Sequence, residues 1–285
     1  MTSDPTPAAH TLPTYDSRGI PVPLFPWIVN YGLDRFDYVA SAIDALPGES
    51  TEWAKIPVLV NEPSYLTFLS ELTGRSKSTI VAFLNDFADD RSFIGAFGPA
   101  LAEVQSLPAA GDLRFHAITL YVIVRSARPT LMIETGVAHG KSSAFILLGM
   151  EHNGSGSLVL VDLPPDGALA DGSLTTMHGR PTGWLVPEYL RHRWTLRLGD
   201  SVDLLPALLA ETGQPDVFLH DSLHTIEHTR AEIEAVLASA SEPLMLLADN
   251  IDMGSGYALA ATLKSRRVVG HAFRDFGGAL LPRRQ

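Results

Sequence analysis

The sequence predicts an α/β fold with a doubly wound, mostly parallel sheet of seven strands. From residue 131 onward, short runs of mostly apolar residues alternate with amphipathic helical patterns, an order typical of a parallel sheet. The runs are apolar at nearly every position, which indicates strands covered by helices on both faces. The last two runs have no helix between them, so they should form a hairpin. We therefore expect a Rossmann-like domain over residues 111–285.

The predicted elements of this domain follow one another in a regular order. A helix at 113–125 comes first. The predicted strands lie at 131–134, 157–162, 194–198, 216–220, 244–249, 268–273 and 278–281. The predicted helices between them lie at 140–150, 202–211, 225–240 and 256–263. Residues 163–192 look like an extended loop, and a loop that long inside a compact domain is usually functional or mobile.

Residues 1–110 differ in pattern from the rest of the chain. Six prolines and little periodicity in residues 1–26 predict an arm or an irregular cap. From about 33 to 108 the pattern is helical, and two helices are marked by apolar residues at i, i+3, i+4 and i+7. These residues are Tyr65, Phe68, Leu69 and Leu72, then Ile80, Phe83, Leu84 and Phe87. We expect an N-terminal arm and helical cap or lid over residues 1–110, which ends near a loop at 108–111.

Charge and composition exclude several classes of protein. The chain carries 21 basic and 32 acidic residues, for a net charge of −11, which argues against a dedicated binder of the nucleic-acid backbone. It has no cysteine, so disulfides, thiolate nucleophiles and cysteine-based metal sites are excluded. No apolar run approaches the length of a membrane helix, and the N-terminus does not resemble a signal peptide. We expect a soluble, cytoplasmic protein without membrane or nucleic-acid partners, and a homo-oligomer.

A glycine-containing loop, I-E-T-G-V-A-H-G-K-S-S over residues 133–143, joins the first predicted strand to its helix. It is one residue short of a phosphate-binding P-loop and lacks the middle glycine of G-x-G-x-x-G. Glu134 at the strand end would repel a triphosphate and favour a cationic ligand. S-adenosylmethionine carries a sulfonium and an ammonium group, so an acidic strand end followed by Gly136 and Gly140 suits it. Ser142 lies at the start of the following helix, and we expect it to contact the cofactor as well.

Two further acidic strand ends strengthen the prediction of a nucleoside site. Asp162 ends the next strand, where doubly wound folds place a carboxylate on the ribose hydroxyls. Asp200 and Ser201 follow the third strand and could border the adenine. Each of these residues also has a structural explanation that involves no ligand. The glycines could form a tight turn of the backbone, and Ser201 could simply cap a helix.

A second group of polar residues follows the fourth and fifth predicted strands. Asp221 lies in F-L-H-D-S-L-H-T, and Asp249 and Asn250 lie in L-L-A-D-N-I. Ligands of open α/β sheets bind beyond the carboxyl ends of the strands, so these side chains should be neighbours. Two carboxylates and an amide oxygen are hard ligands that suit Mg²⁺. In the alternative reading, Asp221 caps a helix and Asp249 and Asn250 form a turn.

His224 follows Asp221 by three residues and could act as a general base near neutral pH. The spacing of His220, His224 and His228 invites a zinc interpretation. However, His220 belongs to the strand and no H-E-x-x-H motif is present. We interpret His228 as a surface or packing residue.

These motifs resemble class I S-adenosylmethionine-dependent methyltransferases, with similarity to the bacterial group of macrocin O-methyltransferases and cephalosporin hydroxylase-like proteins. The Asp, then Asp-Asn pattern also resembles the metal site of catechol O-methyltransferase. The resemblance covers about residues 111–285. It implies that Glu134, Gly136 and Asp162 contact the cofactor and that His224 is the general base. It also implies Mg²⁺ binding by Asp221, Asp249 and Asn250.

We therefore expect a Mg²⁺-assisted O-methyltransferase that acts on a hydroxyl of a small molecule, such as a natural-product phenol, catechol or sugar. Trp27, Tyr31, Trp184 and Tyr189 are candidates to line the acceptor pocket. Two alternatives stay open. One is a non-catalytic or regulatory protein that keeps the cofactor fold. The other is an NAD(P)-dependent oxidoreductase, which the missing G-x-G-x-x-G disfavours.

Overall fold

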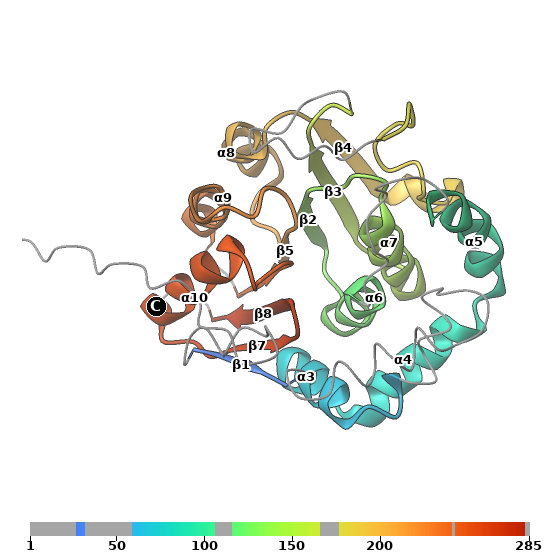
Figure 1. The fold of residues 1–285 in the computed structure, drawn as a ribbon, viewed down its shortest axis with the longest axis horizontal. Coiled ribbons are helices and arrows are strands. Elements are labelled where there is room, and N and C mark those ends of the chain that lie inside the picture. The colour runs from blue at the N-terminus through green and yellow to red at the C-terminus, as the bar shows by residue number, and fades with distance from the viewer. Residues whose placement is uncertain (1–26, 32–58, 106–115, 166–176, 241–242, 283–285) are drawn as a thin grey trace, which may run out of the picture.

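The computed structural model describes residues 27–31, 59–105, 116–165, 177–240 and 243–282. They form one eight-stranded sheet in the order β1-β7-β8-β6-β5-β2-β3-β4, flanked by helices on both faces (Figure 1). The strands are β1 (Ile28–Asn30), β2 (Leu131–Thr135), β3 (Ser157–Asp162), β4 (Trp194–Leu198), β5 (Val217–His220), β6 (Leu244–Ala248), β7 (Gly270–Phe273) and β8 (Phe276–Leu281). Each of the seven predicted strands is present within two residues of its expected bounds. The predicted Rossmann-like fold is confirmed.

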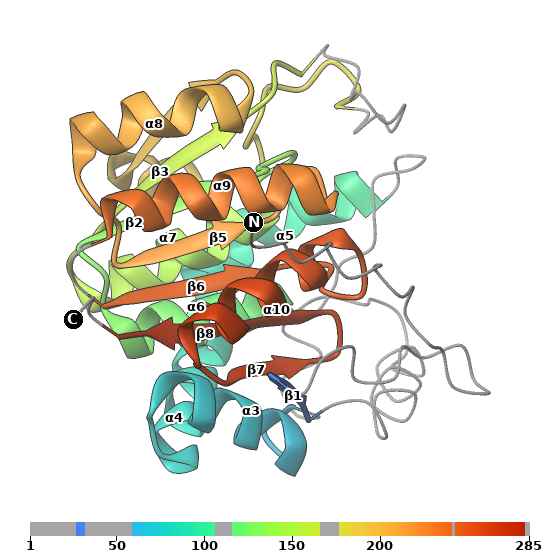
Figure 2. The same cartoon turned by 90° about the vertical axis from the view of Figure 1, so that its left-hand side faces the viewer.

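The sheet is parallel except at β8. Strand β8 pairs antiparallel with both β6 and β7, as expected of a hairpin inserted beside the parallel strands. The remaining pairings are parallel, so most carboxyl ends reach the same edge (Figure 2). We call this the carboxyl edge. The predicted cofactor and metal residues all lie in segments at or just beyond it.

Two sets of helices cover the two faces of the sheet, and each set has its own hydrophobic cluster (Figure 1). Helices α6 (His116–Ala127) and α7 (Lys141–Asn153) lie on one face, with the short 3-10 helix η2 (Glu188–Arg193) beside α7. Helices α8 (Ser201–Thr212), α9 (Ile226–Ser239) and α10 (Gly254–Arg266) lie on the other. The strands between them are almost fully buried, which explains why their sequences are apolar at nearly every position.

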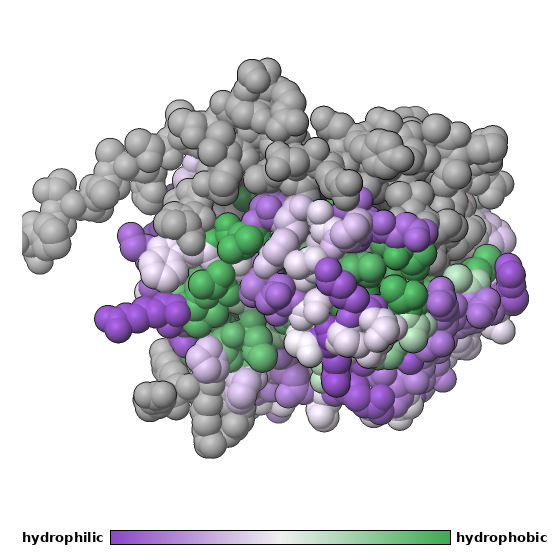
Figure 3. Space-filling view, turned by 90° about the horizontal axis from the view of Figure 1, so that it is seen from below, coloured by the Kyte–Doolittle hydropathy of each residue, from purple (hydrophilic) through white to green (hydrophobic). Residues whose placement is uncertain are grey.

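The eighth strand, β1, is the main addition to the expected fold. It pairs in parallel with β7, with Val29 opposite His271. Asn30 then ties the strand end to Arg274, because its side chain donates to the Arg274 carbonyl and accepts from the Arg274 amide. Val29 and Val269 stay 44% and 47% exposed at this edge. Viewed from below (Figure 3), apolar side chains show in separate groups between polar ones.

The described helices of the N-terminal region pack directly on the core of the sheet domain. They are α3 (Pro63–Thr73), α4 (Lys77–Asp89) and α5 (Arg91–Gln105). Ser76 caps α4 by accepting a hydrogen bond from the Thr79 amide. The buried residues of these helices belong to the same hydrophobic cluster as those of α6 and α7. The predicted arm at 1–26 and the predicted boundary near 110 lie outside the described residues, so the lid role of this region stays a prediction.

An aromatic cluster joins α4 and α5 to α7. The Phe145 ring of α7 lies 5.2 Å from the Phe87 ring, 5.4 Å from the Phe93 ring and 5.5 Å from the Phe97 ring. All four rings are fully buried. Aromatic pairs at these distances contribute beyond the area that they bury. This cluster therefore makes the N-terminal helices part of the folding unit of the sheet.

No helix in the described ranges is long and apolar enough to cross a membrane. The cytoplasmic location expected from the sequence stays a prediction.

We predict that Phe145→Ala destabilises the whole protein by about 3–5 kcal/mol, because it removes the ring on which three others pack. Urea unfolding followed by far-UV circular dichroism measures this, and a single transition is expected. Leu280→Ala is the control, since Leu280 is 55% exposed and its loss should change stability by less than about 1 kcal/mol. Two separate transitions in Phe145→Ala would show that the helices at 63–105 unfold independently.

Candidate functional site

The loop after β2 lies pressed against the loop after β5. Gly136 has a φ of +83°, and a β-carbon added to it would lie 1.9 Å from the Asp221 carbonyl oxygen. Gly140 has a φ of +87° and begins α7, and its added β-carbon would lie 2.7 Å from the Cα of Gly183. Both positions therefore require glycine. The close approach that these glycines permit is to the backbone of the protein itself, and contact of Gly136 or Gly140 with a cofactor stays a prediction.

Glu134, predicted as a cofactor contact, is completely buried at the end of β2. Its carboxylate accepts hydrogen bonds from the hydroxyls of Ser142 and Ser143 in the first turn of α7. Burial raises its pKa to about 7, and the two serine hydrogen bonds offset part of that effect. In this arrangement Glu134 and Ser142 hold the start of α7 against β2. Contact of either residue with a cofactor stays a prediction.

Asp162 holds the other side of the glycine loop. One of its carboxylate oxygens accepts from the amides of Val137 and Ala138, at 3.2 and 2.7 Å. The other accepts from the Leu163 amide at 2.8 Å. Burial raises the pKa of Asp162, and these three hydrogen bonds lower it in part. The residue lies beside the loop, as a ribose-binding carboxylate would, and its carboxylate fixes the loop conformation.

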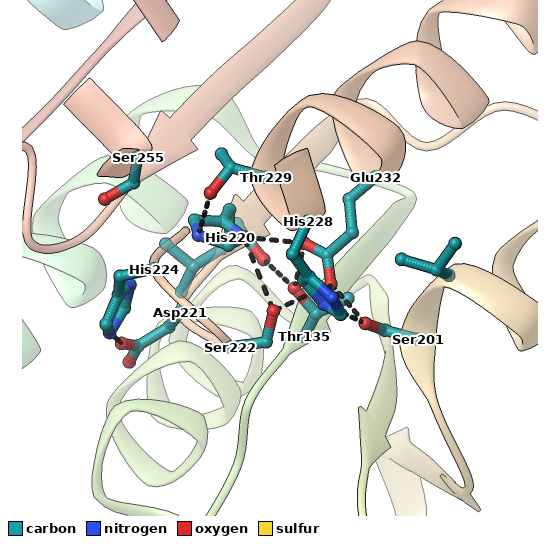
Figure 4. Close-up of polar contacts among 12 residues, drawn as sticks. Thr135, Ser201, His220, Asp221, Ser222, His224, His228, Thr229, Glu232 and Ser255 are labelled. Atoms are coloured by element: carbon teal, nitrogen blue, oxygen red, sulfur yellow. Dashed lines mark hydrogen bonds and ion pairs between the residues drawn. The ribbon is translucent and has the colours of Figure 1, made fainter. Parts of the chain in front are cut away.

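Asp200 and Ser201 lie at the start of α8. Asp200 caps the helix by accepting from the Val202 amide, so the capping role considered for Ser201 belongs to Asp200. Ser201 is buried, and its hydroxyl contacts Glu232 and the Nε2 atom of His228. The Ser201 side chain therefore points into the protein between α8 and α9 (Figure 4).

The predicted metal residues Asp221 and Asp249 are brought together by backbone pairing at the carboxyl edge. The Asp221 amide donates to the Thr135 carbonyl at 2.9 Å, and the Asp249 amide donates to the His220 carbonyl at 3.0 Å. The two carboxyl groups share a hydrogen bond. Burial and the neighbouring charge of Asp249 raise the pKa of Asp221 well above its usual range. A buried carboxyl, that of Asp249, in contact with the partly exposed carboxyl of Asp221 forms a site that favours a cation.

Asn250 follows Asp249 in a turn fixed by Ser255, whose hydroxyl donates to the carbonyls of both residues. Asn250 has a φ of +50°, a left-handed conformation that asparagine adopts more readily than most residues. The structure thus contains the turn of the alternative reading together with the predicted carboxylate pair.

The three oxygen-bearing residues fit a hard divalent cation in chemical type, and two of them, Asp221 and Asp249, lie together. Among the residues that the structure describes, no group of three or more histidine, aspartate or glutamate side chains is arranged to hold a metal. The predicted set contains only two carboxylates. Mg²⁺ binding there stays a prediction.

His224 lies beside this pair, with its Nε2 atom 4.0 Å from an Asp221 carboxylate oxygen. Its ring also stands nearly perpendicular to the His220 ring, with centroids 5.5 Å apart. The structure therefore places the predicted base next to Asp221, one of the predicted metal ligands (Figure 4). His228 does not join them. It faces Glu232 at 3.1 Å, which rules out a shared zinc site in this arrangement.

The sequence analysis missed Glu232, which lies at the centre of a buried polar cluster. It occurs on the buried face of α9 with Thr229, Ile233 and Val236. An ionisable residue within an apolar helical stripe is the signal that could have identified it, because such a residue is almost never fully buried unless it has partners.

The candidate acceptor-lining residues are spread over the molecule. The Trp184 indole donates to His139 Nδ1 at 2.8 Å, which places Trp184 against the glycine loop. Tyr31 follows β1 at the carboxyl edge and hydrogen-bonds with His271. Tyr189 lies in η2, where the nearby charges of Asp90 and Glu151 help to raise its pKa to about 12, after the larger effect of burial. Because Glu151 is near the far end of α7, Tyr189 is distant from the carboxyl edge.

Residues 133–251 match a protein-family model described as a methyltransferase domain. The matched segment begins in β2, contains all the predicted site residues and ends after Asn250. This match confirms the predicted enzyme class at the level of a methyltransferase. No curated protein matches the chain by sequence.

Solved structures are similar to this chain at low sequence identity. Cofactor-bound Rv0187 from MTB is 19% identical with a TM-score of 0.50, over 79% of this chain and 99% of that one. The O-methyltransferase from Bacillus cereus in complex with SAH is 14% identical with a TM-score of 0.48, over 72% and 97%. The O-methyltransferase TomG from Streptomyces achromogenes is 16% identical with a TM-score of 0.49, over 72% and 96%.

We predict that Gly136→Ala is strongly destabilising, because its β-carbon meets the Asp221 backbone. Gly154→Ala is the matched control, since Gly154 has a similar φ of +67° but open space around it. The free energy of unfolding of the control should fall by about 1–2 kcal/mol from backbone strain alone. That of Gly136→Ala should fall by at least twice as much. Chemical denaturation measures both values. Equal losses of stability in the two variants would mean that the loops after β2 and β5 can move apart at little cost.

We also predict a pH dependence of stability that comes from Glu134. Its folded-state pKa of about 7 lies above the reference value of 4.5, so the folded state binds the extra proton between these values. The contribution of Glu134 to the free energy of unfolding is therefore largest below pH 4.5. It falls by about 3 kcal/mol as the pH rises toward 7.

Urea unfolding of the wild type and Glu134→Gln at four pH values with EDTA tests this pH dependence. The fall in stability should be smaller in the variant, and the difference belongs to Glu134. Glu234→Gln, on the exposed side of α9, should behave as the wild type does. Parallel pH profiles for the wild type and Glu134→Gln would contradict the prediction.

Proposed function

We propose that this chain is an S-adenosylmethionine-dependent, Mg²⁺-assisted O-methyltransferase that acts on a hydroxyl of a small molecule. The observation that carries the proposal is the pair formed by buried Asp249 and partly exposed Asp221, with His224 beside Asp221, within the segment that matches a methyltransferase domain. A cation site and a base next to each other are what deprotonation of a hydroxyl requires.

The glycine loop and its neighbours are proposed to bind the methyl donor. The loop at 136–140 is fixed on one side by Asp162 and on the other by the Asp221 backbone. Its acidic surroundings suit the positive charges of S-adenosylmethionine, which supplies an electrophilic methyl group. The solved structures with bound SAH or SAM share this chain's overall fold only, so donor binding here is a proposal.

Asp221, Asp249 and Asn250 would hold Mg²⁺, which lowers the pKa of a bound hydroxyl. His224 would then remove the proton from the acceptor hydroxyl. Because His224 lies within 4.0 Å of Asp221, the carboxylate can stabilise the imidazolium that forms. The remaining contribution is the placement of donor and acceptor at reacting distance by the loops of the carboxyl edge.

The acceptor is proposed to be a phenol, a catechol or a sugar hydroxyl. The specific likeness to macrocin O-methyltransferases and to the catechol O-methyltransferase metal site belongs to this proposal. Trp184, which packs on the glycine loop through His139, is the best placed of the candidate lining residues.

We predict that His224→Ala binds S-adenosylhomocysteine as tightly as the wild type but loses about 10²–10⁴-fold in kcat, as expected for removal of a general base. Calorimetry measures binding, and release of S-adenosylhomocysteine with a panel of simple catechols and hexoses measures turnover. His192→Ala is the control, because His192 is exposed in η2, and it should keep full activity.

Three outcomes would contradict the proposal. Calorimetric binding of NAD without binding of S-adenosylhomocysteine would favour an oxidoreductase. Full turnover in excess EDTA would remove the metal role. Unchanged kcat in His224→Ala would assign the proton transfer to another group.

A further inference from the structure

The buried carboxylate of Glu232 is surrounded by five polar groups (Figure 4). One oxygen, Oε2, lies 2.9 Å from the Thr135 hydroxyl and 2.6 Å from His220 Nδ1. The other, Oε1, lies 2.7 Å from the Ser222 hydroxyl and 3.1 Å from His228 Nε2, and it also accepts from Ser201. The side chain of Glu232 has no exposed surface. A carboxylate offers about four lone-pair sites, so its accepting capacity is fully used.

Four of the five partners of Glu232 lie where three loops of the carboxyl edge join their strands or helices, and the fifth, His228, lies on α9 itself. Thr135 is the last residue of β2, directly before the glycine loop. Ser201 is the first residue of α8, directly after Asp200. His220 and Ser222 flank Asp221. These loops carry the residues proposed to bind the donor, the metal and the acceptor proton, although Glu232 lies on α9 beneath them.

Helix α9 holds His220 at both ring nitrogens. Glu232 contacts Nδ1, and the Thr229 hydroxyl lies 3.0 Å from Nε2. The Thr229 hydroxyl also donates to the Thr225 carbonyl at the start of the helix. The fixed His220 ring packs against the ring of His224. The position of the proposed base is thus connected to Glu232 through a single packed ring.

The charge of Glu232 explains why these contacts are strong. Burial alone would raise its pKa, but hydrogen bonds from His220, His228 and Ser201, with the electrostatic interaction with the His220 ring, lower it far below the usual range. The group is therefore an ionised, buried carboxylate. Hydrogen bonds to a charged acceptor are roughly twice as strong as neutral ones, and loss of the acceptor leaves several buried donors unsatisfied.

We propose that Glu232 is a positioning residue, which holds the loops after β2, β4 and β5 in the mutual arrangement that the donor and metal sites need. The proposal rests on the proposed function for its catalytic consequence. Its structural content is that one side chain joins the segments at the ends of β2, β4 and β5, in addition to the direct contact between the loops after β2 and β5.

Glu232→Gln tests this proposal, because it keeps the shape but replaces one accepting oxygen with an amide donor. At least two of the five contacts then lose their acceptor. Hydrogen exchange should become at least tenfold faster in the segments 133–142, 199–203 and 219–226 together, relative to the core strand β6. The affinity for S-adenosylhomocysteine should fall at least tenfold.

Two variants on the same helix are the controls. Glu234→Gln makes the same chemical change on the exposed side of α9 and should leave exchange and binding unchanged. Ile233→Ala removes a buried side chain of the second hydrophobic cluster and should destabilise the protein without separate loosening of the three loops. A general loss of stability is thereby distinguished from a loss of positioning.

If Glu232→Gln does not fold, single-contact variants decide the question. Ser201→Ala should loosen only 199–203, and Ser222→Ala only 219–226. Exchange in Glu232→Gln that matches Ile233→Ala, or loosening of α9 alone, would overturn the proposal. If the wild type binds no S-adenosylhomocysteine, the proposed function fails, and the exchange data still decide the role of Glu232.

Discussion

The site depends on how closely two loops approach each other at the carboxyl edge. Gly136 allows the β2 loop to lie against the backbone at Asp221, where a β-carbon would come within 1.9 Å of the carbonyl oxygen. Parallel pairing of β2 with β5 and of β5 with β6 brings the strand ends to the same level. The glycine then allows the loops beyond them to stay in contact. The juxtaposition of Asp221 and Asp249 is a consequence of this backbone geometry.

The acidic residues of this edge divide into two kinds by their hydrogen-bond partners. Glu232 has enough donors to stay ionised, although it is completely buried. Asp221 has few hydrogen-bond donors around it and faces the carboxyl of Asp249. Burial and the repulsion between the two carboxyls therefore raise the pKa of Asp221. The first arrangement is typical of a structural anchor and the second of a site that awaits a positive ligand. Sequence alone does not separate them, because both are acids near strand ends or on the following helix.

The sheet could be predicted because its central strands are buried on both faces, which leaves an apolar run for each. Strand β1 could not be predicted, since three residues are too few to show a periodic pattern. Its pairing partner, β7, also lies more than 240 positions away in the sequence. Asp221, Asp249 and His224 could be placed together from topology alone, because carboxyl ends of parallel strands share an edge. The Ser201 hydroxyl points inward because it contacts Glu232, an acidic residue in an apolar helical stripe. The spacing of residues in the sequence does not give the direction of a side chain, so this contact could not be predicted.

The shared core has a consequence for the order in which the chain folds during synthesis. Helices α4 and α5 are made first, but Phe87, Phe93 and Phe97 complete their packing on Phe145, which the ribosome adds later as part of α7. Until then their apolar faces are open to solvent and to other chains. Strand β1 waits longer still, until β7 has emerged. Contacts this distant in sequence slow folding, so the nascent chain is a natural client for chaperones that bind apolar helices.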